Sequence, residues 1–232
     1  MVLPEIEPGA SVKCIVTAGP TYESLDQVRR LTNFSTGKLG CDLASHLQSR
    51  GHEVVLLKGY YSIHPGEIKA SEVATFTTTA DLSSRLQTLA QTAIDAVFHV
   101  AAVSDFAFGA VYQRSDRGDL QQVRSGKFST RGGTLLVELV PTPKIIARLR
   151  EWYPRAQLVG WKYEVDGTRA DAINMALAQM ENCRTDACVV NGPAYGEGFG
   201  RVVRGESCEH LTDAPTLFTR LEEGLIRRAS EL

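Results

Sequence analysis

The segment V-K-C-I-V-T-A-G-P-T (Val12–Thr21) contains the pattern that decides the fold. Its first six residues are mostly apolar and β-branched, which predicts a strand that runs directly into a turn at Gly19. Lys38–Ser49 then repeats leucines and alanines at helical spacing, and Glu53–Leu57 (E-V-V-L-L) predicts a second strand. Gly51 suits the left-handed turn that ends the helix. Strand, helix and strand in this order indicate a βαβ unit.

The same alternation continues along the chain. Further strands are predicted over Val73–Thr77, Ala96–Val103, Thr134–Leu139, Gln157–Trp161, Ala187–Val190 and, with a shorter pattern, Arg201–Arg204. Helices are predicted over Ala80–Ala93, Pro143–Trp152, Arg169–Glu181 and Ala214–Arg228. The stretch Phe106–Gly133 is polar and aperiodic, and we expect a long functional or mobile loop there. The expected fold class is α/β, a Rossmann-like three-layer sandwich with a mostly parallel central sheet, in one domain over residues 1–232.

Composition narrows the class of protein. The chain has 232 residues, a formal net charge of −2 and a pI near 6.2, so nothing favours nucleic acid as a partner. No apolar run approaches the roughly 18 residues of a membrane span. Met1–Ser11 lacks the basic and apolar regions of a secretory signal, and we expect a frayed lead-in and a cytoplasmic protein. The five cysteines include no C-x-x-C pair, which favours reduced, mostly buried thiols over a catalytic thiol.

Candidate site residues follow the predicted strands, because ligands of parallel sheets bind at the carboxyl ends of the strands. Gly19 would let the backbone approach a phosphate, although an ordinary turn explains it as well and no G-x-G-x-x-G occurs. T-N-F-S-T-G-K-L-G (Thr32–Gly40) precedes a helix whose free N–H groups attract anions, and Lys38 adds charge. Ser35 or Thr36 in it could equally be a plain N-cap.

Other strand ends carry weaker signals. Asp105 could meet a ribose or a base amino group, or only cap a turn. Trp161 could stack on a base or belong to the core, and Asn191 is a further candidate. His99 lies mid-strand, where a satisfied core histidine is favoured over a catalytic one. Lys127 lies between flexible neighbours and could close over an anion, although a solvated lysine is the default.

Combined, these motifs resemble the phosphopantothenoylcysteine synthetase family over nearly the whole chain and in the same order. The opening signature is T-A-G-P-T, then D-x-V-R at Asp26–Arg29, then T-N-F-S-T-G-K-L-G. A-A-V-S-D-F, K-F-S-T-R-G-G, L-V-E-L-V-P-T-P and L-V-G-W-K-Y-E follow. Asn191 and Gly198-Phe199-Gly200 complete the set.

The resemblance implies a ligase of coenzyme A biosynthesis. Such an enzyme joins 4′-phosphopantothenate to L-cysteine through an acyl-nucleotide, using CTP or ATP with Mg²⁺ and releasing pyrophosphate and a nucleoside monophosphate. Its partners would be these small molecules and a second copy in a homodimer, with no nucleic acid, no membrane and no resident metal ligands.

The resemblance also implies roles for individual residues. Asn33 would hold the acyl-nucleotide, and Lys127 would close on it. Trp161 replaces the usual phenylalanine. The implied nucleotide-binding residues are Gly19, Ser35, Gly37, Lys38, Gly40, Ala102, Ser104, Asp105, Trp161 and Lys162.

Several features depart from the family pattern. No flavin decarboxylase domain precedes the motifs, so a standalone synthetase is expected. Gln179 and Cys183 stand near the positions of the lysines that bind the CTP triphosphate in bacterial enzymes. G-W-K-Y-E is closer to the eukaryotic form, whose enzymes can use ATP, and the loop around Lys127 lacks paired lysines. An inactive nucleotide-binding relative therefore remains an alternative. An NAD(P)-dependent oxidoreductase is less favoured, because its glycine fingerprint and a Tyr-x-x-x-Lys pair are missing.

Overall fold

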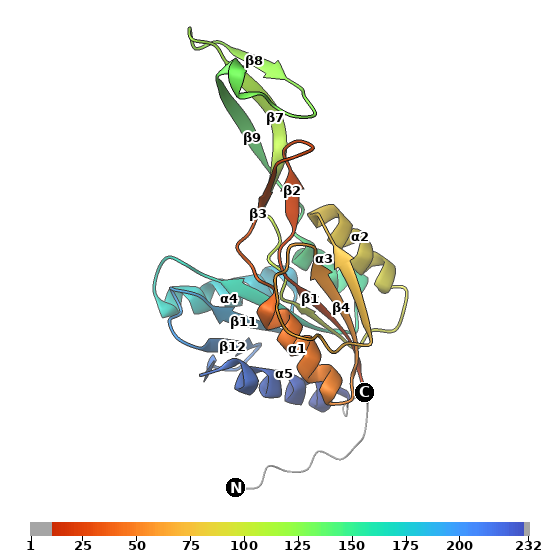
Figure 1. The fold of residues 1–232 in the computed structure, drawn as a ribbon. Helices are drawn as coiled ribbons and strands as arrows, with labels where there is room; N and C mark the ends of the chain where they lie inside the picture. The colour runs from red at the N-terminus through yellow and green to blue at the C-terminus, as the bar shows by residue number, and fades with distance from the viewer. Residues whose placement is uncertain (1–10, 230–232) are drawn as a thin grey trace.

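The structure, a computed structural model, describes residues 11–229 and consists of an α/β body with a projecting arm (Figure 1). The body contains an eight-stranded sheet in the order β13-β12-β11-β10-β6-β1-β4-β5. Neighbours from β11 to β5 are parallel, whereas β12 and β13 add an antiparallel edge. The strands are β1 (Lys13–Ala18), β4 (Glu53–Gly59), β5 (Glu72–Phe76), β6 (Ala96–His99), β10 (Gln157–Tyr163), β11 (Ala187–Asn191), β12 (Phe199–Val203) and β13 (Glu209–Leu211).

Helices cover both faces of this sheet. α1 (Lys38–Ser49) and α5 (Ala214–Ala229) share one core with alternate residues of β1, among them Cys14, Val16 and Ala18. α2 (Thr79–Leu89), α3 (Ile145–Trp152) and α4 (Arg169–Cys183) cover the opposite face. The predicted three-layer sandwich with a mostly parallel sheet is therefore confirmed. Burial on both faces explains why β1, β4 and β6 read as nearly continuous apolar runs.

The strand order reverses between β1 and β6. From β1 the chain proceeds through α1 to β4 on one side, and it later returns through α2 to β6 on the other. The loops that follow β1 and β6 are joined by hydrogen bonds from Thr21 N to Ala102 O (3.1 Å) and from Ala102 N to Gly19 O (3.0 Å). Such a reversal creates the crevice in which ligands of open α/β sheets bind.

The arm corrects one prediction. Most of the expected loop Phe106–Gly133 is regular structure: β7 (Phe106–Arg114), β8 (Leu120–Val123) and a short 3₁₀ helix η1 (Thr130–Gly132). With β9 (Thr134–Pro141) the two strands form a separate antiparallel sheet. Only Val111 and Phe128 are buried in this region, so its strands lack the apolar face that a periodicity search detects.

Other differences are local. The hairpin β2 (Tyr22–Ser24) and β3 (Arg30–Thr32) was not predicted, because its strands are short and largely exposed. β6 ends at His99 rather than Val103, since the Ala101 amide donates to the Thr17 hydroxyl instead of extending the ladder. α3 begins at Ile145 after an N-cap at Lys144, so Pro143 precedes the first turn.

Two compositional predictions can be compared with the structure. All five cysteines are free, and all but the half-buried Cys208 are buried, as expected. Within residues 11–229 no helix is both long and apolar enough to cross a membrane. The predicted N-terminal lead-in lies almost wholly outside the described residues.

The contact between α1 and β1 leaves no room for a side chain at Gly40. A Cβ at this position would lie 2.7 Å from Ala18 Cβ and 3.0 Å from Thr17 O. We predict that Gly40→Ala lowers the free energy of unfolding by about 1–3 kcal/mol, measured by urea denaturation, because neither neighbour can move freely. Gly224→Ala in α5 is the control: its nearest atom, Gln157 Nε2, is 3.3 Å away, and helix propensity favours alanine. Equal stability of wild type and Gly40→Ala would contradict the prediction.

Candidate active site

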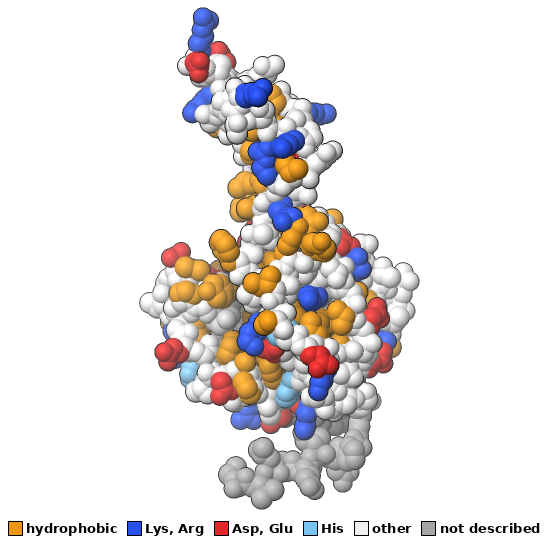
Figure 2. Space-filling model, in the orientation of Figure 1, with side chains coloured by type: hydrophobic (Ala, Val, Ile, Leu, Met, Phe, Trp, Pro, Cys, Tyr) orange, Lys and Arg blue, Asp and Glu red, His pale blue; other side chains and the backbone are white. Residues whose placement is uncertain are grey.

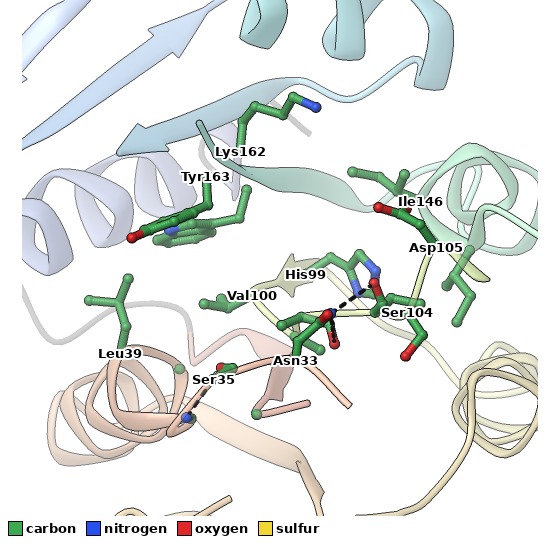
Figure 3. Close-up of a pocket in the computed structure, with 18 of the residues that line it drawn as sticks. Asn33, Ser35, Leu39, His99, Val100, Ser104, Asp105, Ile146, Lys162 and Tyr163 are labelled. Carbon is green, nitrogen blue, oxygen red and sulfur yellow. Dashed lines mark hydrogen bonds between the residues drawn. The ribbon is translucent and has the colours of Figure 1, made fainter. Parts of the chain in front are cut away.

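A pocket of about 820 Å³ opens at the carboxyl ends of β1, β6, β10 and β11 (Figure 3). Asn33 and every predicted nucleotide-binding residue line it, from the turn after β1 to the end of β10. Residues far apart in the sequence thus meet at the point where the strand order reverses.

The N-terminus of α1 forms one wall. Its N-cap is Gly37, with φ 75° and no side-chain cap, so neither Ser35 nor Thr36 is the N-cap. Ser62 Oγ donates to Thr36 O (2.9 Å), and a Cβ on Gly37 would lie 2.2 Å from that same Oγ. Only glycine fits both the left-handed backbone and the close contact. The Lys38 N–H donates to Thr36 Oγ1 (3.2 Å), whereas the next first-turn N–H groups, of Leu39 and Gly40, have no capping side chain.

The N-terminus of α3 forms the opposite wall and is also uncapped. Its N-cap Lys144 makes no capping hydrogen bond, and its ammonium pairs with the Asp105 carboxylate. By contrast, Thr78 caps α2, and Thr168 and Asp171 form a capping box on α4. Both helix ends that open on the pocket thus lack a side-chain N-cap hydrogen bond and keep positive potential, which suits anionic ligands.

Asn33 spans the centre of the pocket. Its Nδ2 donates to Ala102 O (3.2 Å) and Val103 O (3.3 Å), so the amide bridges from the segment after β3 to the loop after β6 (Figure 3). The side chain is exposed, and its amide oxygen has no partner within the described chain. A bound ligand can therefore reach this amide directly.

The ends of β10 and β11 contribute orphaned polar atoms. Trp161 Nε1 and Asn191 Oδ1 are buried without a hydrogen-bond partner, although both residues line the pocket. Trp161 also packs against the core under α1, so its core and pocket interpretations are compatible. Lys162 pairs with Glu164 at 3.0 Å. Unsatisfied buried polar groups are costly, so both side chains would gain a hydrogen bond by turning toward a ligand in the pocket.

Several lining residues were not among the predicted site residues. Lys144, Tyr163 and Gln179 line the pocket because they flank strand ends or face them from α4. His99 is buried and hydrogen-bonded as expected of a core histidine, yet it also lines the pocket. Knowledge of which strands are adjacent was needed to place them in the pocket.

Comparison with known proteins defines the family. The family model for the DNA/pantothenate metabolism flavoprotein C-terminal domain matches residues 10–204 of the sequence. The chain belongs to this family. It resembles the coenzyme A biosynthesis bifunctional protein CoaBC of Thermococcus kodakarensis (33% identity, covering 82% of this chain and 44% of that protein). It also resembles CoaBC of Bacillus subtilis (31% identity, covering 80% and 42%). The chain thus spans less than half the length of these relatives.

A solved structure of the DNA/pantothenate metabolism flavoprotein from Streptococcus pneumoniae has the same fold. It superposes with a TM-score of 0.81 at 26% identity, covering 94% of this chain and 99% of that one. The resemblance inferred from the sequence motifs is thereby confirmed at the level of the family.

One predicted site residue of this family domain lies elsewhere. Lys127 is exposed in the segment between β8 and η1 and does not line the pocket. The Asp26 carboxylate fixes this segment by accepting hydrogen bonds from the amides of Val28 (2.9 Å), Arg29 (2.7 Å) and Phe128 (3.2 Å). Burial by itself would raise the pKa of this carboxyl, but the backbone donors and the Arg29 guanidinium lower it. Asp26 therefore ties the Lys127 loop to the β2–β3 hairpin.

The family domain has no ready-made metal centre in its described part. Residues 11–229 contain no group of three or more His, Cys, Asp and Glu side chains that could hold an ion. The carboxylate that lines the pocket, Asp105, is paired with Lys144.

Proposed function

We propose that the chain is the phosphopantothenate–cysteine ligase domain of coenzyme A biosynthesis. The observation that supports this best is the gathering of Asn33, the uncapped N-termini of α1 and α3, and the orphaned atoms of Trp161 and Asn191 around one pocket. The named function of the CoaBC relatives agrees with it.

The proposed reaction needs positioning and charge stabilisation. A carboxylate is a poor electrophile, so the pantothenate carboxylate first attacks the α-phosphate of a nucleoside triphosphate and pyrophosphate leaves. The amine of cysteine then attacks the acyl carbon, and nucleoside monophosphate departs. Amide N–H groups and cations that face the developing charges lower the barriers of both steps.

The cations of the pocket can replace the missing α4 lysines. Gln179 Nε2 lies 3.4 Å from Trp161 O and carries no charge. Lys38, Lys144 and Lys162 line the pocket from three other elements. Each pairs with a carboxylate here, so a polyphosphate would bind by exchanging these partners. We propose CTP or ATP, carried with Mg²⁺, as the nucleotide.

We further propose a homodimer that delivers Lys127 to the site. The neck between body and arm exposes large apolar side chains, visible as orange patches in Figure 2. They include Val28, Leu31, Phe34, Phe106, Leu139 and Val140. A second copy would cover such a surface. Because Asp26 holds the Lys127 loop on its own hairpin, Lys127 would act in the pocket of the partner.

The direct test of function is pyrophosphate release. We expect purified protein with Mg²⁺, 4′-phosphopantothenate and cysteine to release pyrophosphate and form the cysteine adduct with CTP or ATP offered separately, and not with UTP or GTP. Omission of phosphopantothenate is the control. A folded protein that releases nothing with any nucleotide would instead support an inactive relative.

Asn33→Asp should separate the two half-reactions. The variant keeps pyrophosphate release but forms little amide, because an aspartate carboxylate cannot donate to the Ala102 and Val103 carbonyls that hold this side chain. It also repels the acyl oxygen that gains negative charge as the amine attacks. Asn174→Asp on the exposed side of α4 is the matched control and should behave as wild type. Normal amide formation by Asn33→Asp would remove the role proposed for Asn33.

Mixing two inactive variants tests the origin of Lys127. If Lys127 acts in the partner's pocket, equal mixing and subunit exchange of Asn33→Asp and Lys127→Ala should restore about a quarter of wild-type turnover, since half of the dimers carry one intact site. Each variant alone serves as the baseline. Mixed dimers without activity, verified by differential tags, would place Lys127 in its own subunit's site.

A further inference from the structure

His99, at the carboxyl end of β6, has one ring nitrogen bound in the core and one left over. The residue is only 6% exposed and lines the pocket (Figure 3). Nδ1 lies 3.1 Å from Thr17 Oγ1 on the neighbouring strand. Nε2 has no hydrogen-bond partner in the described chain. Unlike Trp161 Nε1 and Asn191 Oδ1, it is not closed off from solvent. The free edge of the imidazole therefore faces the pocket.

The Thr17 hydroxyl selects the tautomer of this ring. Thr17 Oγ1 accepts a hydrogen bond from the Ala101 amide (3.0 Å), and its own proton has no acceptor in the described chain other than His99 Nδ1. Every group is satisfied when the hydroxyl donates to Nδ1, which leaves the ring proton on Nε2. Burial lowers the pKa of His99 to about 4, so the ring is neutral near pH 7. His99 thus presents a single N–H donor and no acceptor to the pocket.

The surroundings of this donor favour an anionic acceptor. The register that pairs Val159 with Phe98 brings Gly160 beside His99, where no side chain intervenes. A Cβ on Gly160 would lie 2.6 Å from Gln179 Nε2 on α4 and 2.8 Å from Ile146 Cδ1 in the first turn of α3. His99 therefore lies on the sheet face that bears the uncapped end of α3. The pocket carboxylate, Asp105, is neutralised by Lys144.

We propose that His99 Nε2–H donates a hydrogen bond to a phosphoryl oxygen of the substrate bound in the pocket, and that Thr17 is the positioning residue that keeps the proton on Nε2. This inference rests on the proposed function. The phosphoryl group belongs either to the nucleoside triphosphate or to 4′-phosphopantothenate, which share this chemistry.

Side-chain ¹⁵N NMR of the full chain tests the donor directly. Without ligand, His99 should show a protonated Nε2 and an unprotonated Nδ1 between about pH 6 and 8. Mg-ATP, Mg-CTP and 4′-phosphopantothenate are then added to separate samples. A shift of the Trp161 indole N–H signal reports whether the pocket is filled. We expect a downfield shift of the His99 Nε2–H signal with the ligand that supplies its phosphoryl partner.

The other outcomes are distinct. A Trp161 response without any change at His99 would overturn this inference and leave the proposed function standing. If the Trp161 N–H signal responds to none of the three ligands, both this inference and the proposed function are overturned. Protonation of Nδ1 in the free protein would refute the role assigned to Thr17.

Variants give a second readout. His99→Leu and Thr17→Val should weaken binding of the same phosphorylated ligand by about tenfold or more, the usual effect of losing a hydrogen bond to a charged group. Thr17→Ser keeps the hydroxyl and should bind as wild type. Equal affinity of Thr17→Ser and Thr17→Val, or unchanged affinity in His99→Leu, would contradict the proposal. If Thr17→Val fails to fold, Thr17→Ser and the wild-type NMR still decide it.

Discussion

The junction between the loops after β1 and β6 is the constraint on which the site depends. Two backbone hydrogen bonds join Gly19 and Thr21 to Ala102, and the Thr17 hydroxyl ties the Ala101 amide to the end of β1. The Asn33 side-chain amide donates hydrogen bonds to the carbonyls of Ala102 and Val103 in the same loop. Because the strand order reverses here, no strand can fill the crevice, and the floor of the pocket is fixed by these few contacts.

The pocket is built from groups that the fold leaves unsatisfied. α1 and α3 lack an N-cap side-chain hydrogen bond, while α2 and α4 are capped by the side chains of Thr78 and Thr168. Trp161 Nε1 and Asn191 Oδ1 are buried without partners. Such groups reduce stability, and a ligand that carries both anionic oxygens and a hydrogen-bond donor would satisfy the N–H groups and the Asn191 oxygen together.

The sequence predicted the body of the fold better than the arm. β1, α1 and β4 were recognised because burial on both faces produces continuous apolar strands and a one-sided helix. In the arm only β9 was predicted, since Phe106–Arg114 and Leu120–Val123 pair with each other but bury almost no apolar face. The ends of the predicted strands located most of the pocket. His99 was interpreted as a core histidine, and its place in the pocket, like that of Lys144, required the strand order. Lys127 was assigned by resemblance, and no pattern in a single chain reveals that its loop is fixed at a distance from its own pocket.

The central claim is that this pocket activates a carboxylate by transferring a nucleotide to it. The most direct measurement follows ¹⁸O from the labelled carboxylate of 4′-phosphopantothenate during turnover with Mg²⁺, nucleoside triphosphate and cysteine. Attack on the α-phosphate followed by cleavage of the acyl C–O bond predicts one labelled oxygen in the nucleoside monophosphate. Label in inorganic phosphate, or its absence from every phosphorylated product while the cysteine adduct forms, would contradict the account.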